Sequence, residues 1–180
     1  MLTSIAINST TAADKQLRLL YETAFPVEEQ IPYDELICLL NAMGIDYTAY
    51  YDGEMLVGLT MVLRLSRYNW GWYFAVCEQL RGKGYGQDIL TAVLEKYRGQ
   101  RPFVIDVESP DQPDAPNPEQ RRRRYAFYLR NGFRDTCTHR TWGGVTYTIL
   151  SSSDDPFTQQ DYDEIVAALR ACWENMPGGR

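Results

Sequence analysis

The sequence predicts an α/β fold in which helices alternate with about seven strands, three of them in a mid-chain antiparallel meander. Two runs of aromatic and branched residues, 45–51 and 55–66, lie on either side of Asp52-Gly53, which is a strong hairpin signal. A strand, a glycine turn, a helix and another strand follow one another in the middle of the chain. Because 180 residues, 44% of them hydrophobic, suffice for one buried core, we expect a single domain over residues 1–180.

Helix signals are clearest at the expected ends of the first two helices. Thr11 is the expected cap of the first helix, which Pro26 ends, and Pro32 starts a second helix that stops before Gly44. Apolar residues recur at helical spacing in later runs. The expected helices are 12–25, 32–43, 87–97, 119–131 and about 161–175, and the expected strands are 4–8, 45–51, 55–66, 70–76, 102–108, 133–142 and 145–152.

Charge and composition exclude several classes of function. The chain has 18 Lys and Arg against 24 Asp and Glu, a net charge of −6, which is the wrong sign for neutralising nucleic-acid phosphates. The four cysteines have neither metal-type nor disulfide-framework spacing. No apolar run approaches the roughly 18 residues of a membrane span, and the first residues lack a signal-peptide pattern. We therefore expect a cytoplasmic protein without a nucleic-acid or membrane partner.

Residues 109–118 are expected to form a surface loop rather than a domain boundary. Four prolines lie there among acidic and amide residues, a composition that supplies neither core nor ladder hydrogen bonds. Arg121–Arg124 follow on a predicted helix. Four consecutive arginines point around most of a helix, so we expect a solvated face or ion pairs with the acids of the loop.

The stretch from Arg81 to Gly86 has glycine at every second position, directly before a predicted helix. Such a backbone lets successive N–H groups converge beside the positive end of the helix dipole, which would cradle a diphosphate. The alternative is a glycine-rich turn without a ligand. A mononucleotide phosphate loop needs Lys-Ser or Lys-Thr after its last glycine, where this chain has Gln87-Asp88. A dinucleotide fold would place the glycines after its first strand.

Two motifs resemble those of the GCN5-related N-acetyltransferases, the GNAT family. Arg81–Gly86 is similar to the family's Arg/Gln-x-x-Gly-x-Gly/Ala loop, and Val76 matches the valine five residues before its arginine. The run YAFYLRNGF is similar to the family's later aromatic and Gly-Phe signature, with Tyr128 and Gly132-Phe133 at the expected spacing. The resemblance spans about residues 17–150.

The resemblance implies a twisted, mixed and mostly antiparallel sheet of about seven strands, flanked by helices, that splays open between the strands 72–76 and 103–107. Acetyl-coenzyme A, the co-substrate, would lie in that gap, and no metal is expected. Arg81 and Lys83 would either add charge near the phosphates or be merely solvated. The expected coenzyme-binding residues are Phe74, Val76, Arg81, Gly82, Lys83, Gly84, Tyr85 and Gly86.

Acetyl transfer from a thioester to an amine needs a base for the amine proton and an acid for the departing thiolate. The resemblance implies that Tyr128 is the acid, and the alternative is a ring that only packs. Asp106 matches a position where some family members carry a glutamate base. Alternation along the strand places Glu108 on the same face, where mutual repulsion would favour a proton on one of the two. A bridging water, Glu108 in place of Asp106, and simple hydration of both stay open. Cys77 is expected to be a buried, inert thiol rather than a covalent acetyl carrier.

The expected acceptor side is acidic. Glu28 and Glu29 lie between the first two predicted helices, where an ammonium substrate would be attracted, whereas Asp34 and Glu35 are explained by the dipole of the second helix. We therefore expect an N-acetyltransferase that acts by direct transfer on a primary amine of a small molecule or peptide. The alternative is a non-catalytic coenzyme A-binding sensor or scaffold. The C-terminal helix is expected either to cover the cleft or to form a homodimer contact.

Overall fold

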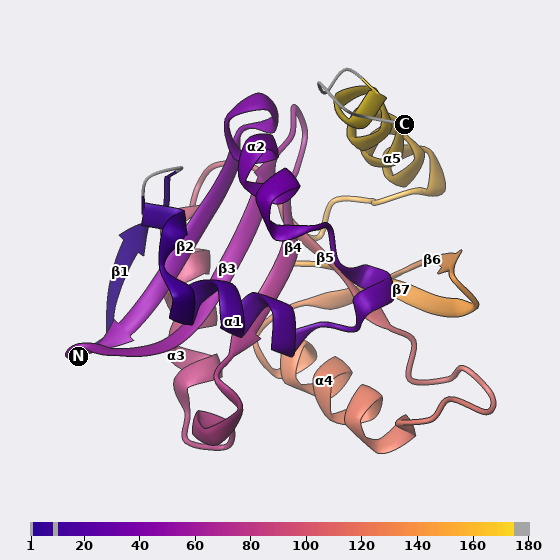
Figure 1. Ribbon diagram of the computed structural model, residues 1–180. Helices are drawn as coiled ribbons and strands as arrows, with labels where there is room; N and C mark the ends of the chain where they lie inside the picture. Colours follow the sequence, from indigo (N-terminus) through magenta and orange to yellow (C-terminus); the bar gives the residue numbers. More distant parts are fainter. Residues whose placement is uncertain (1, 9–10, 175–180) are drawn as a thin grey trace. The chain divides into compact units, whose positions relative to one another are not determined.

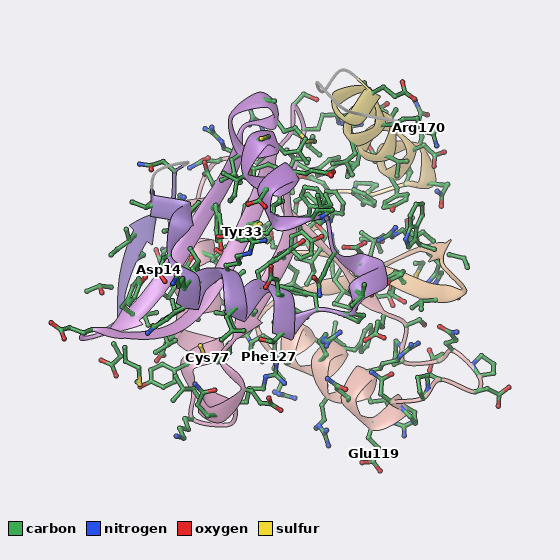
Figure 2. The ribbon with its side chains drawn as sticks, in the orientation of Figure 1. Asp14, Tyr33, Cys77, Glu119, Phe127 and Arg170 are labelled. Atoms are coloured by element: carbon green, nitrogen blue, oxygen red, sulfur yellow. The ribbon has the colours of Figure 1, made fainter. Side chains whose placement is uncertain are left out.

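The computed structural model of the protein describes residues 2–8 and 11–174 (Figure 1). Two compact units make up the chain, residues 1–101 and residues 102–180, and each has its own antiparallel strands. None of the helices within the described ranges is long and apolar enough to span a membrane. The expectation of a single domain over the whole chain stays a prediction.

The first unit contains an antiparallel sheet with helices on both faces. Its elements are β1 (Leu2–Ala6), α1 (Lys15–Ala24), α2 (Tyr33–Met43), β2 (Ile45–Asp52), β3 (Met55–Arg64), β4 (Asn69–Val76) and α3 (Tyr85–Lys96), with 3-10 turns at Thr11–Ala13, Val27–Glu29 and Glu78–Leu80. The strands lie in the order β1-β2-β3-β4. In Figure 1, α1 and α2 lie in front of these strands and α3 lies behind them. The two residues Gly53-Glu54 join β2 to β3, and Gly53 has a φ of 61°, so the predicted hairpin is confirmed.

The first helix begins later than the sequence predicts. Thr11 lies in a 3-10 turn, and the N-cap of α1 is Asp14. The Asp14 carboxylate accepts hydrogen bonds from the N–H groups of Gln16 at 2.7 Å and Leu17 at 3.3 Å. The prediction that Thr11 caps this helix was therefore wrong, because an ionised acceptor three residues later satisfies the first N–H groups and favours the positive end of the helix dipole.

Close packing of α3 on the sheet depends on Gly58 in β3. A Cβ atom at this position would lie 2.5 Å from the carbonyl oxygen of Ala75 and 2.6 Å from Cδ1 of Ile89. Ile89 belongs to the buried face of α3, and Ala75 lies on β4. Only glycine therefore lets the helix lie this close to the strands that carry it.

We expect Gly58→Ala to lower the free energy of unfolding by about 2 kcal/mol, because the added methyl group has to displace either the backbone of β4 or the side chain of Ile89. Urea unfolding followed by tryptophan fluorescence measures this change. Trimming the opposing side chain provides the control: Gly58→Ala with Ile89→Val should be less destabilised than the sum of the two single variants. Wild-type stability of Gly58→Ala would show that the packing is looser than described.

The second unit contains a three-stranded antiparallel arrangement and two helices within the described residues. Its elements are β5 (Phe103–Glu108), α4 (Pro118–Arg130), β6 (Arg134–Trp142), β7 (Val145–Ser151) and α5 (Gln159–Glu174). The strands lie in the order β5-β7-β6. β6 bulges between Asp135 and His139, where Cys137 has a φ of 58°. The predicted C-terminal helix is present through Glu174, and residue 175 lies outside the described residues.

Candidate functional site

The glycine loop joins the end of β4 to the start of α3, as predicted. Gly82 and Gly84 have φ values of 77° and 93°, in the left-handed region that favours glycine. Gly84 is also the N-cap residue of α3. Apart from the glycine itself and its chain neighbours, no heavy atom of a described residue would lie within 4 Å of a Cβ atom at either glycine. The loop therefore needs glycine for its backbone shape, and the space beside it is open.

Five consecutive N–H groups of this loop, from Gly82 to Gly86, make no hydrogen bond to any other residue that the structure describes. The neighbouring groups are engaged: the N–H of Arg81 donates to Glu78, and that of Gln87 donates to Gly84. The five donors lie at the N-terminus of a 12-residue helix, where the dipole adds positive potential. This arrangement suits an anion with several oxygen atoms, such as a diphosphate.

Side chains anchor the loop at both of its ends. The Arg81 Nε donates to the carbonyl oxygen of Val76 at 3.3 Å, and the Tyr85 hydroxyl donates to Asp52 Oδ2 at 2.8 Å. The second bond lowers the pKa of Asp52. Phe74 and Val76 are both half-buried on β4, the strand that leads into the loop. Arg81 and Lys83 are exposed. The first unit thus places all the residues expected to bind the coenzyme along β4 and the loop that follows it.

Two buried tyrosines hold the turn between α1 and α2. The Tyr73 hydroxyl donates to the carbonyl oxygen of Glu29 at 2.6 Å, and the Tyr21 hydroxyl donates to that of Ile31 at 3.0 Å. The N–H of Ile31 donates back to the Tyr21 hydroxyl at 2.9 Å. Burial raises the pKa of both phenols, so both stay protonated donors. The backbone that carries Glu29 is therefore fixed.

The acidic residues of this region differ in their surroundings. Glu29 is half-buried in the turn, whereas the side chain of Glu28 lies outside the described part of the structure. Asp34 lies in the first turn of α2 and forms an ion pair with Arg18 at 3.1 Å. Asp34 thus complements both a helix dipole and an arginine, which agrees with the structural explanation expected for it.

Tyr128 lies on α4 and is buried, with its ring against those of Phe127 and Phe133 at centroid distances of 5.2 and 5.5 Å. Its hydroxyl makes no hydrogen bond to another residue of the described ranges. Burial raises the pKa of Tyr128 to about 12, Arg124 opposes this shift, and the charge of Asp106 adds to it. The phenol is therefore protonated at neutral pH, and its proton is not committed to a described acceptor.

The two carboxylates of β5 are each held by arginine. Arg140 Nη2 lies 2.7 Å from Asp106 Oδ2, Arg121 Nη2 lies 2.9 Å from Glu108 Oε1, and Arg124 Nη1 lies 2.8 Å from Glu108 Oε2. The two carboxylate side chains are only 7% and 14% exposed. This differs from the expected pair of mutually repelling acids, because each charge is compensated from another element.

Arg121 is buried and pairs with Glu108 of β5, which differs from both expected arrangements of the four arginines, a solvated face and ion pairs with the acids of the loop. Its Nε donates to Asn117 Oδ1 and its Nη1 donates to Gln112 Oε1, both at 2.8 Å. The same Gln112 oxygen accepts the N–H of Thr146 on β7 at 2.9 Å. The proline-rich loop 109–118 is therefore fastened to both α4 and β7, and Glu108 is held within this network.

One signal could have identified Arg121. Arg121 and Tyr128 are seven residues apart, so they lie on one face of a helix, and a packed Tyr128 ring was one of the two alternatives for that residue. For Arg140 the sequence offers no such local signal. Its partner Asp106 is 34 residues away, and only the pairing of β5 and β6 with β7 brings them together.

Two other kinds of site chemistry, metal binding and attack by a thiol, can be compared with the residues of the described ranges. No group of histidine, cysteine and acidic side chains there could hold a metal ion. Cys77 is buried, its thiol donates to the carbonyl oxygen of Leu56 at 3.3 Å, and burial raises its pKa. A thiol in this state is a poor nucleophile.

Comparison with known proteins gives one family and one fold. The family model of the acetyltransferase (GNAT) domain matches residues 45–135. A solved structure assigned to that family, from Bacteroides thetaiotaomicron, is 21% identical, covers 94% of this chain and 96% of its own, and has a TM-score of 0.71. A GNAT family acetyltransferase from Elizabethkingia anophelis with acetyl-CoA bound is 16% identical to this chain. It covers 83% of this chain and 96% of its own, and has a TM-score of 0.60.

The ribosomal-protein-S18-alanine N-acetyltransferase from Escherichia coli is 14% identical to this chain. It covers 88% of this chain and 100% of its own, and has a TM-score of 0.61. No curated protein matches the chain by sequence. These structural similarities confirm the predicted fold class.

Proposed function

The chain belongs to the GNAT family of acetyltransferases, and on that basis we propose that it moves an acetyl group from acetyl-coenzyme A to a primary amine. The acceptor is a small molecule or a peptide, and transfer is direct within a ternary complex. The observation that carries this proposal is the run of five N–H donors from Gly82 to Gly86 at the start of α3, in a loop with open space beside it.

The residues present fit a coenzyme A molecule at its diphosphate and its arm. The loop N–H groups would hold the diphosphate, because that group offers several oxygen acceptors to converging donors. The backbone of Phe74 and Val76 would pair with the amides of the pantetheine arm, as strands pair at a sheet edge. When bound, acetyl-coenzyme A supplies the thioester. The Elizabethkingia anophelis structure, which has acetyl-CoA bound, supports binding of the coenzyme by a chain of this fold.

Tyr128 is the proposed acid. Its phenol is protonated at neutral pH, and its proton is not committed to another described residue. It can therefore protonate the departing thiolate. Glu108 has both carboxylate oxygens engaged by arginines, which makes it the weaker candidate for the base. Asp106 is the proposed base, acting on the amine directly or through a water molecule.

Charge supports an amine acceptor that arrives as an ammonium ion. The chain has a net charge of −6, and the backbone of Glu29 is fixed in the turn between α1 and α2. A carboxylate there would raise the local concentration of a cationic substrate. The acceptor then has to lose its proton before it can attack, which is why a base is needed.

Asp106→Asn is expected to lower kcat by about 10²-fold and to abolish the acidic limb of the kcat profile, because it removes the proposed base. Glu108→Gln should keep that limb and only shift it. Steady-state kinetics over a pH series measures both. Because Glu108→Gln also weakens a buried ion pair, thermal melting must first show that each variant is folded at the assay temperature. Loss of the limb in Glu108→Gln alone would assign the base to Glu108.

A non-catalytic coenzyme A sensor or scaffold is the alternative from a different class. Release of coenzyme A thiol from acetyl-coenzyme A, measured with a panel of primary amines and matched alcohols, separates the two. We expect release that depends on the amine and not on the alcohol. Tight coenzyme binding without amine-dependent release over a broad panel would favour the sensor. A homodimer and a cytoplasmic location stay predictions.

A further inference from the structure

Arg140 lies between two tyrosine rings, one of which belongs to the C-terminal helix. Its Cζ atom is 4.4 Å from the ring centre of Tyr147 on β7 and 5.7 Å from that of Tyr162 in the first turn of α5. Both tyrosines are buried. The distances suit cation–π contact, which is strongest where water is excluded. Arg140 and Tyr162 both lie outside residues 45–135, the part that the family model matches.

The guanidinium held by these rings is the one that binds Asp106. Arg140 donates to Asp106 Oδ2 from Nε at 2.9 Å and from Nη2 at 2.7 Å. The two side chains are 23% and 7% exposed, so little water screens the pair. The orientation of the Asp106 carboxylate therefore depends on where Arg140 is held.

The start of α5 is itself fixed to β6. The buried Asp161 carboxylate accepts from the N–H and the hydroxyl of Thr158, each at 2.8 Å, which secures the first turn. The Thr138 hydroxyl of β6 donates to the carbonyl oxygen of Phe157 at 3.2 Å. Thr138 lies two residues before Arg140 on the same strand. The segment that carries Tyr162 is thus fastened next to the arginine that its ring covers.

We propose that Tyr162 makes the C-terminal helix part of the catalytic apparatus: with Tyr147, it holds Arg140, and Arg140 in turn fixes the carboxylate of Asp106. Tyr162 and Arg140 are positioning residues. The inference rests on the proposed function, in which Asp106 takes the acceptor proton. The C-terminal helix lies beyond the part of the chain that resembles the family. Its proposed role is to position Arg140, in place of the two expected roles, a cover of the cleft and a subunit contact.

Several groups face Asp106 and contribute to its electrostatic environment. They are Arg140 of β6, Tyr162 of α5, Tyr128 of α4 and Glu108 on its own strand, whereas Tyr147 of β7 faces the guanidinium of Arg140. Among these groups, Arg140 is the cation that pairs with Asp106. The two arginines of α4 pair with Glu108 instead. If Arg140 loses its position, the nearby buried carboxylate binds a proton more readily. The acidic limb of the kcat profile should then move to higher pH.

Replacing Tyr162 with leucine tests the role of the ring. We expect Tyr162→Leu to lower kcat by about 10-fold, with unchanged affinity for coenzyme A and an acidic limb at higher pH, because the carboxylate is misplaced. Tyr162→Phe should recover most of the activity, since the ring remains and the hydroxyl makes no hydrogen bond to another described residue. Ile165→Ala, which removes a buried side chain one turn later without removing the ring, should stay close to the wild type in kcat and pH profile.

A second readout does not depend on activity. Carbon-13 NMR of the Asp106 carboxyl group, assigned with Asp106→Asn, reports its protonation midpoint in each variant. We expect the midpoint to rise in Tyr162→Leu and in Arg140→Met, and to stay near the wild type in Tyr162→Phe and Ile165→Ala. An unchanged midpoint in Tyr162→Leu, or an equal rise in Ile165→Ala, would overturn the proposal. If the wild type releases no thiol with any amine, the proposed function fails, and this titration still decides separately whether Tyr162 and Arg140 hold the carboxylate of Asp106.

Discussion

Gly84→Val is expected to weaken coenzyme A binding by about 100-fold, or ~2.7 kcal/mol, while the protein stays folded. Gly84 caps α3 with a φ of 93°, in the middle of the five N–H groups that make no hydrogen bond to another described residue. Beyond its chain neighbours, a Cβ atom there meets no atom of the described residues within 4 Å, so the branched side chain would project into the open space beside the loop. That space is where a diphosphate would approach the backbone. Calorimetric titration with coenzyme A measures the effect.

Backbone strain is the main competing explanation for such a loss. A side chain at positive φ costs on the order of 1 kcal/mol wherever it occurs. Gly99 provides the matched control, because it also has a positive φ, 70°, and open space around its Cβ position. It follows the C-terminal end of α3, which is about 18 Å long, so it lies well away from the loop. Gly99→Val should therefore lose similar stability and keep its affinity. Equal losses of affinity in both variants would show that strain, and not the loop, controls binding.

Tyr128→Phe is expected to lower kcat by about 10²-fold and to leave coenzyme A affinity nearly unchanged. The substitution keeps the ring that packs between Phe127 and Phe133 and removes only the hydroxyl. Since the pKa of Tyr128 is raised to about 12, the phenol stays protonated through the neutral and mildly alkaline range. The factor by which Tyr128→Phe lowers kcat should therefore be constant across that range.

Tyr125→Phe is the control on the same helix. The Tyr125 hydroxyl donates to Asp135 Oδ2 at 2.9 Å, so this variant loses a phenol and a hydrogen bond one turn away from Tyr128. Its kcat should stay within about threefold of the wild type, since no step of the reaction is assigned to it. If Tyr128→Phe turns over as fast as Tyr125→Phe while chemistry limits the rate, Tyr128 only packs, and water protonates the thiolate.

Features set by neighbours in the chain were predictable from the sequence. Pro32 precedes α2, and Gly44 ends it with a φ of 65° and an N–H bonded to Leu40. Gly53 at the β2–β3 turn and Gly82 and Gly84 in the loop before α3 likewise have positive φ. In each case a single residue type is needed for a backbone shape that few other residues adopt, so the prediction needs no knowledge of the fold.

Features set by distant partners were not predictable. The carboxylates of Asp106 and Glu108 share a face of β5 by simple alternation, but their arginines come from β6 and α4. Nothing in the run FVIDVE indicates those partners. The cap of α1 shows the same limit on a smaller scale, because Thr11 and Asp14 are both good capping residues, and only the structure shows that the Asp14 carboxylate accepts from the first N–H groups of the helix. Tyr162 becomes meaningful only once α5 is seen to place it over Arg140.

Incubating the protein with acetyl-coenzyme A labelled in the acetyl group, together with the best amine from the panel, tests the central claim most directly. Mass spectrometry of the small molecules and of the intact protein follows the label. Direct transfer predicts one labelled acetyl group on the amine nitrogen for each thiol released, and an unlabelled protein at every time point. Label on the protein before it reaches the amine, above all on Cys77, or coenzyme binding with no labelled amine, would contradict the account.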